Sequence, residues 1–157
     1  MKIISVGTRN TERSFLDFPR KLYRNDPNHV VPFDGEIKRA FDRNENPYFR
    51  HGDATRWIAV DERERTVGRI AAFYDRTRNM AGDVKTGGCG FFESIDDLQV
   101  AHLLFDTAKS WLQKKGYEAM MGPINFGEND TNWGCLVHGF VPQGLGMAYN
   151  FPYYRNL

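Results

Sequence analysis

A strand–helix–strand pattern in the second half of the chain constrains the fold more than any other feature. A glycine- and aromatic-rich segment typical of a strand, 87–93, precedes a long amphipathic helix, 98–115, and a second strand, 118–125. The helix carries its apolar residues in one stripe at the helical period. Short joints predict a β-α-β unit, which places both strands parallel in one sheet. Because ligands bind at the carboxyl ends of such strands, we expect a functional site at 93–97 and 125–130.

Acidic residues open the predicted helix. Asp96, with Gln99 three residues later, matches a capping box, and Gly116 matches a residue that ends a helix. The sequence therefore predicts Asp96 as the N-cap.

The rest of the chain predicts further strands and helices around this unit. The expected segments are a strand at 2–6, a helix at 11–25, a short helix at 34–41, two hairpin strands at 56–61 and 67–74, and a last strand at 144–149. Pro19 interrupts the first helix, and Asp17 is the expected cap where that helix restarts. The hairpin and the strand at 87–93 form an antiparallel meander that leads into the parallel unit. The predicted fold class is therefore α/β with a mixed sheet (α+β).

We expect a single domain over residues 1–157, because the length suits one domain and the chain has no repeats or linkers. Asn150, Phe151 and Pro152 match the start of a helix, yet the chain stops at Leu157. A start signal without a helix body predicts a truncated domain that lacks its C-terminal strands. Such a domain is either a fragment or is completed as a homodimer through its exposed C-terminal edge.

Charge and cysteine content narrow the function classes. A formal net charge of +1 with mixed signs gives no reason to expect nucleic acid or a membrane as a partner. Cys89 and Cys135 fit no metal-ligand spacing, so we expect no metal, reduced thiols and a cytoplasmic location. Cys135 and His138 lie three residues apart, as a nucleophile and its base would. No third orienting group is evident, which favours a small buried thiol.

The order of the elements resembles the first two thirds of the fold of the GNAT N-acetyltransferase superfamily. Several short motifs are similar to a bacterial group of uncharacterised GNAT-like proteins, and this resemblance spans nearly the whole chain. These motifs are Leu22 with Asp26, Pro27, Asn28 and Pro32, then 46–49, 67–72, 90–97, 122–125 and 150–154.

The resemblance implies an acyl-CoA N-acyltransferase fold and transfer of an acyl group from acetyl-CoA or another acyl-CoA to a small-molecule amine. It places the pantetheine arm between the strands at 90–93 and 120–125, and the pyrophosphate at the start of the following helix. The residues expected to bind the cofactor are Phe91, Phe92, Ser94, Asp96, Asp97 and Asn125.

The candidate catalytic residues come from two segments. Glu93 ends a central strand and is a candidate general base through water, with a solvent-facing strand end or an Arg69 partner as the structural alternative. Tyr153 and Tyr154 fall near the position where acetyltransferases often place a tyrosine general acid, although two tyrosines after a proline also suit packing. Asn129 and Asp130 follow the second parallel strand, as substrate-binding residues or as turn residues.

The sequence departs from the family pattern at the predicted pyrophosphate site. Asp96 takes the place of an Arg or Gln there, and Asp97 takes the place of a glycine. Carboxylates oppose an anion, and a capping aspartate uses the backbone donors that a pyrophosphate needs. Two alternatives follow, a GNAT-like acyltransferase that holds its donor differently and a non-catalytic half-domain or oligomerisation module that needs a partner.

A binding module of another class is a third interpretation. The pattern at 88–92 resembles a strand that stacks on RNA bases, but Gly87 stands where a basic residue belongs and Cys89 where the first ring belongs. With a net charge near zero as well, the sequence disfavours this interpretation.

Overall fold

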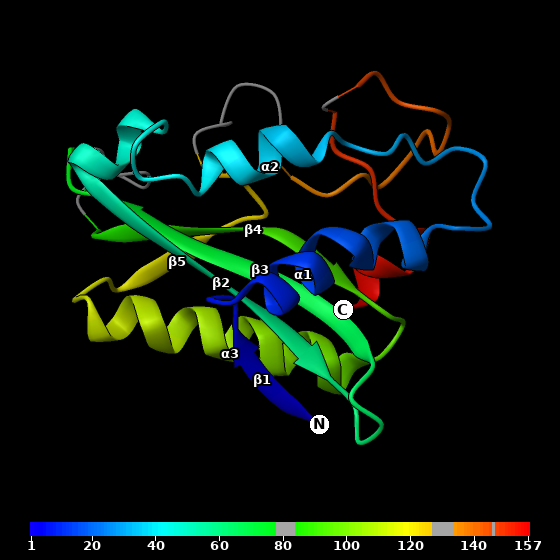
Figure 1. The fold of residues 1–157 in the computed structure, drawn as a ribbon, viewed down its shortest axis with the longest axis horizontal. Coiled ribbons are helices and arrows are strands. Elements are labelled where there is room, and N and C mark those ends of the chain that lie inside the picture. Colours follow the sequence, from blue (N-terminus) through cyan, green and yellow to red (C-terminus); the bar gives the residue numbers. More distant parts are fainter. Residues whose placement is uncertain (78–83, 127–133, 146) are drawn as a thin grey trace.

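The computed structural model describes residues 1–77, 84–126, 134–145 and 147–157. The described strands form one sheet in sequence order, with β1 to β4 antiparallel and β4 parallel to β5 (Figure 1). The strands are β1 (Lys2–Ser5), β2 (Gly52–Val60), β3 (Thr66–Asp75), β4 (Thr86–Ser94) and β5 (Ala119–Met121). The helices are α1 (Arg9–Leu22), α2 (Asp34–Ala40), η1 (Pro47–Arg50), α3 (Leu98–Lys114) and η2 (Pro152–Asn156). The predicted mixed sheet, with its meander followed by a β-α-β unit, is confirmed.

Helices cover the sheet on both faces. In Figure 1, α3 lies on one side of the sheet and α1 with α2 on the other. The stripe of α3 packs into one buried cluster through Val100, Leu104 and Leu112. Phe15 of α1 and Ile37 of α2 belong to a second cluster on the opposite face. The core therefore has two layers, separated by the sheet.

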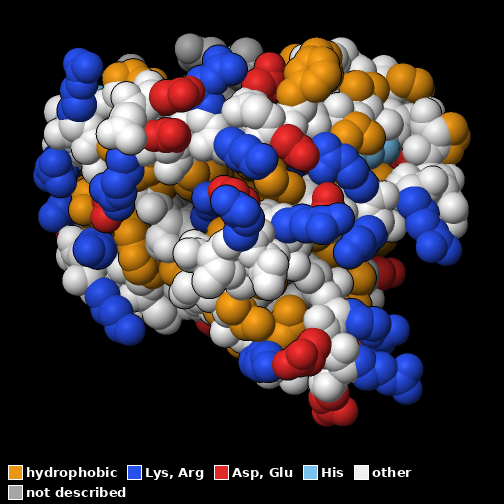
Figure 2. All heavy atoms as spheres, viewed as in Figure 1, with side chains coloured by type: hydrophobic (Ala, Val, Ile, Leu, Met, Phe, Trp, Pro, Cys, Tyr) orange, Lys and Arg blue, Asp and Glu red, His pale blue; other side chains and the backbone are white. Residues whose placement is uncertain are grey.

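The visible surface carries mixed charge. In Figure 2, Lys and Arg side chains lie among Asp and Glu side chains. Ion pairs account for part of this mixture, for example Arg20 with Asp34 at 2.7 Å and Arg13 with Asp17 at 3.4 Å. No large region of a single sign is visible on this face.

The N-cap of α3 is Asp97, so the prediction of Asp96 is wrong by one residue. The Asp97 side chain accepts hydrogen bonds from the backbone N–H groups of Gln99 at 2.8 Å and Val100 at 3.3 Å. Asp97 has the extended backbone that an N-cap needs, and its own N–H donates to Ile95 O at 2.7 Å. Two neighbouring aspartates offer the same capping chemistry, and the preceding turn selects the second.

Helix α1 continues through Pro19, so the predicted restart at Asp17 is wrong. Proline has no N–H and cannot donate to the carbonyl four residues earlier, which here belongs to Phe15. That carbonyl instead accepts a hydrogen bond from Arg69 Nη1 at 2.9 Å. A side chain from β3 thus satisfies the group that Pro19 leaves unpaired, and the helix does not break.

The segment after β5 departs from the prediction. The ladder ends at Met121 rather than at Asn125, because Pro123 has no N–H to donate. Ile124 N then donates to Cys89 O at 2.8 Å, which keeps the segment against β4. The described residues of 144–149 form no strand, so that expectation is wrong there. The proline-led start near Asn150 is present as the short helix η2.

Candidate active site

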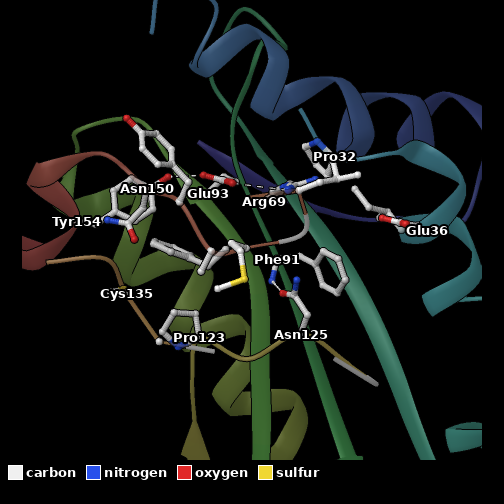
Figure 3. A pocket seen from close by; sticks show the side chains of 17 residues that line it. Pro32, Glu36, Arg69, Phe91, Glu93, Pro123, Asn125, Cys135, Asn150 and Tyr154 are labelled. Atoms are coloured by element: carbon white, nitrogen blue, oxygen red, sulfur yellow. Dashed lines mark hydrogen bonds and ion pairs between the residues drawn. The ribbon is translucent and has the colours of Figure 1, made fainter. Parts of the chain in front are cut away.

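A pocket of about 310 Å³ opens at the carboxyl end of β4 (Figure 3). Its wall is built by β3, β4, the segment after β5, the entrance to α2 and the C-terminal segment. Its lining includes Arg69, Phe91, Phe92, Glu93, Asn125 and Tyr154. The pocket lies at the edge where the parallel strands led us to expect a site.

A β-bulge in β4 shapes the floor of this pocket. Arg69 pairs with Glu93 and Ala71 with Gly90, so Ile70 alone lies opposite Phe91 and Phe92. Phe91 has a positive φ of 50°, and its backbone N–H donates to Asn125 Oδ1 at 2.7 Å. The Asn125 amide thus joins the two parallel strands beyond the end of their regular ladder.

Gly90 permits this close contact between the strands. A Cβ at position 90 would lie 1.9 Å from Ile124 O and 2.8 Å from Asn125 Oδ1. No side chain fits there while the segment after β5 keeps its place. At this point, the glycine in β4 therefore allows the segment after β5 to lie against β4.

Glu93 lies at the centre of a buried polar cluster. Tyr23 and Tyr154 each donate a hydroxyl hydrogen bond of 2.6 Å to Glu93 Oε2. Arg69 Nη2 lies 3.7 Å from Glu93 Oε1, so the two groups form an ion pair but are too far apart for a hydrogen bond. The cluster joins β3, β4, the end of α1 and η2, so it holds distant parts of the chain at one carboxylate.

The surroundings of Glu93 change its pKa. Burial raises the pKa of Glu93, while the Arg69 charge and the two tyrosine hydrogen bonds oppose that rise. Burial also raises the pKa values of Tyr23 and Tyr154, and the Glu93 charge adds to both shifts. The tyrosines therefore remain hydroxyl donors, and Glu93 is a carboxyl group whose pKa burial raises above the usual glutamate value. Such a group is suited to general base chemistry.

The two C-terminal tyrosines differ in placement. Tyr154 lines the pocket, and its hydroxyl also accepts a hydrogen bond from Ser94 N at 3.0 Å. Tyr153 is not among the lining residues, and its hydroxyl donates to Ser94 O at 2.7 Å. Both rings fix η2 to the end of β4, but the structure brings only Tyr154 to Glu93.

The structure places only some of the residues that were predicted to bind the cofactor in the pocket. Phe91, Phe92 and Asn125 line the pocket. Ser94 is buried, and its hydroxyl donates to Ile95 O at 2.8 Å. Asp96 and Asp97 lie at the start of α3, outside the pocket lining. Asn129 and Asp130 fall outside the described residues.

The start of α3 does not fit a pyrophosphate in the way the family pattern requires. Asp97 already accepts from Gln99 N and Val100 N, which are backbone donors that an anion would use. The neighbouring Asp96 adds a second carboxylate. A nucleotide held at this helix end would have to displace the cap and meet two negative charges.

Sequence reasoning missed Tyr23, which lies 70 residues from Glu93 along the chain. The amphipathic pattern of α1 indicates an inward-facing side chain near the helix end, but no sequence signal pairs it with β4. Cys135 lines the pocket and is exposed, so the expectation of a buried thiol is wrong, and the described residues show no hydrogen bond between it and His138. In the same described ranges, no group of three potential metal ligands occurs, and no helix is long and apolar enough to cross a membrane.

No family model matches the sequence. Two curated proteins are similar to it. Protein YghO of Escherichia coli K12 is 32% identical over 152 residues, and the bacterial ceramide synthase of Caulobacter vibrioides is 30% identical over 155 residues. These alignments cover 93% and 98% of this chain, but only 37% and 40% of the two relatives. The chain thus spans well under half the length of these relatives.

Solved structures share the architecture. A predicted acetyltransferase from Clostridium acetobutylicum, solved with acetyl-CoA, superposes with a TM-score of 0.54 at 11% identity, over 79% of this chain and 80% of that one. A GNAT-family acetyltransferase from Staphylococcus aureus superposes with a TM-score of 0.51 at 14% identity, over 77% and 72%. The chain has the GNAT acetyltransferase fold. In this GNAT fold, the pocket beside Glu93 lies at the carboxyl ends of the two parallel strands.

Proposed function

We propose that this chain is an N-acyltransferase domain that transfers an acyl group from an acyl-CoA to a small-molecule amine. The observation that carries the proposal is Glu93, a buried carboxylate on the wall of the pocket at the carboxyl end of β4. The GNAT fold supports the reaction class, because an acetyltransferase of this fold was solved with acetyl-CoA.

Glu93 is the base in this proposal. An amine must lose a proton as its nitrogen attacks the acyl carbon, and a carboxylate with a raised pKa accepts that proton well near neutral pH. The receiving atom is Oε1, because Oε2 already accepts two hydroxyl hydrogen bonds. The acyl-CoA supplies the activated acyl group, whose bond to sulfur breaks as the amide forms.

Tyr154 is the candidate acid of the site. Its hydroxyl lies on the pocket wall and remains protonated, since burial and Glu93 hold its pKa well above the ordinary value. Glu93 Oε2 holds this proton before the reaction, and the leaving thiolate takes it once the amine proton has reached Oε1 and weakened that hydrogen bond. Tyr153, bonded to the Ser94 backbone, supports η2 instead.

The substrates are proposed to be apolar. One relative is named a bacterial ceramide synthase, and a ceramide is an amide of a fatty acid with a long-chain amino alcohol. The pocket combines the Glu93 cluster with apolar side chains, which suits such a molecule: Pro32, Ile37, Phe91, Phe92, Leu145 and Met147. We propose that a long-chain donor is held by its acyl and pantetheine parts, without a pyrophosphate bound at the capped start of α3.

The test is an assay of amide formation. The purified chain is incubated with acetyl-CoA or palmitoyl-CoA and with a panel of short-chain amines and long-chain amino alcohols, and products are identified by mass spectrometry. We expect an amide with at least one donor and a loss of about 100-fold or more in Glu93→Gln. Glu64→Gln is the matched control, because Glu64 is exposed, pairs with the exposed Lys2 and lies in the turn between β2 and β3, outside the pocket lining.

The proposal is contradicted if no donor and amine pair yields product, or if Glu93→Gln is as active as the wild type. The first outcome would favour the alternative of a non-catalytic half-domain that needs a partner domain.

A further inference from the structure

Tyr23 occupies an unusual position for a residue at the end of a helix. It is the C-cap of α1 and is 2% exposed. Its ring is stacked on His29 at 4.2 Å and packs against Phe151 at 4.6 Å and Tyr149 at 5.7 Å. These three rings fix the direction of the Tyr23 side chain. Its hydroxyl is thereby held at Glu93 Oε2, at 2.6 Å.

The two oxygens of Glu93 have different surroundings. Oε2 accepts from Tyr23 and Tyr154, whose own hydroxyls lie 3.4 Å apart. Among the described residues, Oε1 accepts no hydrogen bond and faces Arg69 Nη2 at 3.7 Å. One oxygen is therefore saturated and the other is available to a ligand.

Arg69 cannot readily move closer to Oε1. Its Nη1 donates to the Phe15 carbonyl that Pro19 leaves unpaired, at 2.9 Å. Its guanidinium also lies over the Phe15 ring, with 4.8 Å from Cζ to the ring centroid. Helix α1 thus positions two of the three polar neighbours of Glu93, Arg69 through the Phe15 carbonyl and Tyr23 through the C-cap.

We propose that Tyr23 is a positioning residue for Glu93, which together with Tyr154 occupies Oε2 and so leaves Oε1 as the atom that takes the amine proton. This inference rests on the proposed function. Tyr23 touches the base and not the reacting atoms, so it acts through Glu93.

The inference makes a pH-dependent prediction. The groups that face Glu93 are Arg69 from β3, Tyr23 from α1 and Tyr154 from η2, and the Glu93 charge also raises the pKa values of Tyr153 and Cys135. Tyr23→Phe keeps the ring but removes one hydrogen bond that favours the ionised carboxylate, so the pKa of Glu93 rises further. Protonated Glu93 cannot accept a proton, so activity is lost at lower pH and is recovered at higher pH.

The experiment compares pH profiles of kcat in wild type and Tyr23→Phe. We expect kcat of Tyr23→Phe to fall roughly tenfold on the acid side of the profile, to lie within about twofold of wild type at pH 9, and KM to change little. Tyr74→Phe is the control, since Tyr74 lies on β3 outside the pocket lining and its ring packs against Trp111 and Tyr117. Its profile should match wild type.

A second measurement needs no activity. The Glu93 carboxyl carbon is titrated by ¹³C NMR in the ligand-free protein, with Glu93→Gln to assign the signal. A higher titration midpoint in Tyr23→Phe than in Tyr74→Phe supports the positioning role, even where an inactive wild type contradicts the proposed function. Should Tyr23→Phe fail to fold, Tyr154→Phe tests the same oxygen. Equal midpoints in the Tyr23→Phe, Tyr74→Phe and wild-type proteins would overturn the inference.

Discussion

The buried side chain of Arg69 connects helix α1 to Glu93 on β4. It bonds the Phe15 carbonyl, lies over the Phe15 ring and faces Glu93, and its side chain is 4% exposed. Burial lowers the pKa of Arg69, and the nearby Glu93 opposes this shift. An arginine nevertheless keeps its charge, so Arg69 is the cation that makes a buried carboxylate tolerable here.

Replacing Arg69 with Met tests whether the buried Glu93 carboxylate depends on this cation. The variant removes the counter-ion of Glu93 and the donor to the Phe15 carbonyl, so we expect a loss of about 3 kcal/mol in the free energy of unfolding at pH 7. Urea denaturation followed by circular dichroism measures it. The loss should shrink as the pH falls, because the pKa of Glu93 is raised further in the variant and its protonation removes the unpaired charge.

Lys2→Met is the control for this prediction. Lys2 pairs with Glu64 at 3.1 Å, but both side chains are more than half exposed, at 57% and 79%. Such a pair contributes less than about 1 kcal/mol. An Arg69→Met variant as stable as Lys2→Met at pH 7 would contradict the role given to the buried pair.

At the level of helices and strands, the residues at the start of α3 stabilise the helix and also affect whether an anion can bind there. Asp97 caps the helix and thereby occupies backbone donors that an anion would use. Asp97→Ala should cost about 1 kcal/mol in unfolding free energy, and Asp96→Ala less than about 0.5 kcal/mol. Urea denaturation of the two variants separates the cap from its neighbour.

The same helix start gives a binding prediction through the double variant Asp96→Gly, Asp97→Gly. This change frees the backbone donors and removes two negative charges, so coenzyme A should bind more tightly, as measured by calorimetry. Unchanged affinity would show that the donor's pyrophosphate does not approach this helix end.

Regular elements were predictable, and the exceptions depend on contacts between distant residues. The apolar stripe of α3 and the alternation in the hairpin depend on local periodicity, which the sequence displays directly. The continuity of α1 through Pro19 depends on Arg69, which is fifty residues away in the chain and invisible to any local pattern. Likewise, Asp96 and Asp97 both satisfy a capping pattern, and only the turn at Ile95 distinguishes them.

The candidate site was predictable only in part for the same reason. Glu93 and Asn125 follow from the rule that sites lie at the carboxyl ends of parallel strands. Tyr23 does not, because its contact with Glu93 joins residues 70 apart in the chain and depends on tertiary packing that no local pattern displays. Tyr153 and Tyr154 were candidates from the family resemblance alone, and the bond of Tyr154 to Glu93 depends on the placement of η2.

For the whole molecule, the sheet brings both ends of the chain to one carboxylate. Tyr23 comes from the first helix and Tyr154 from the last, and both donate to Glu93 on the central strand β4. The GNAT fold thus supplies the scaffold, and the pocket beside Glu93 is where we place the chemistry.

The most direct test of Glu93 as the general base is the pH dependence of amide formation from palmitoyl-CoA and a long-chain amino alcohol, followed by mass spectrometry. Because burial raises the pKa of Glu93, the acid limb of the wild-type profile should have its midpoint above the ordinary glutamate value of about 4.3. Activity should be lost as the pH falls through that midpoint, and Glu93→Gln should show no such limb. A pH-independent rate in the acid range, or the same profile in Glu93→Gln, would contradict the assignment of Glu93 as the base.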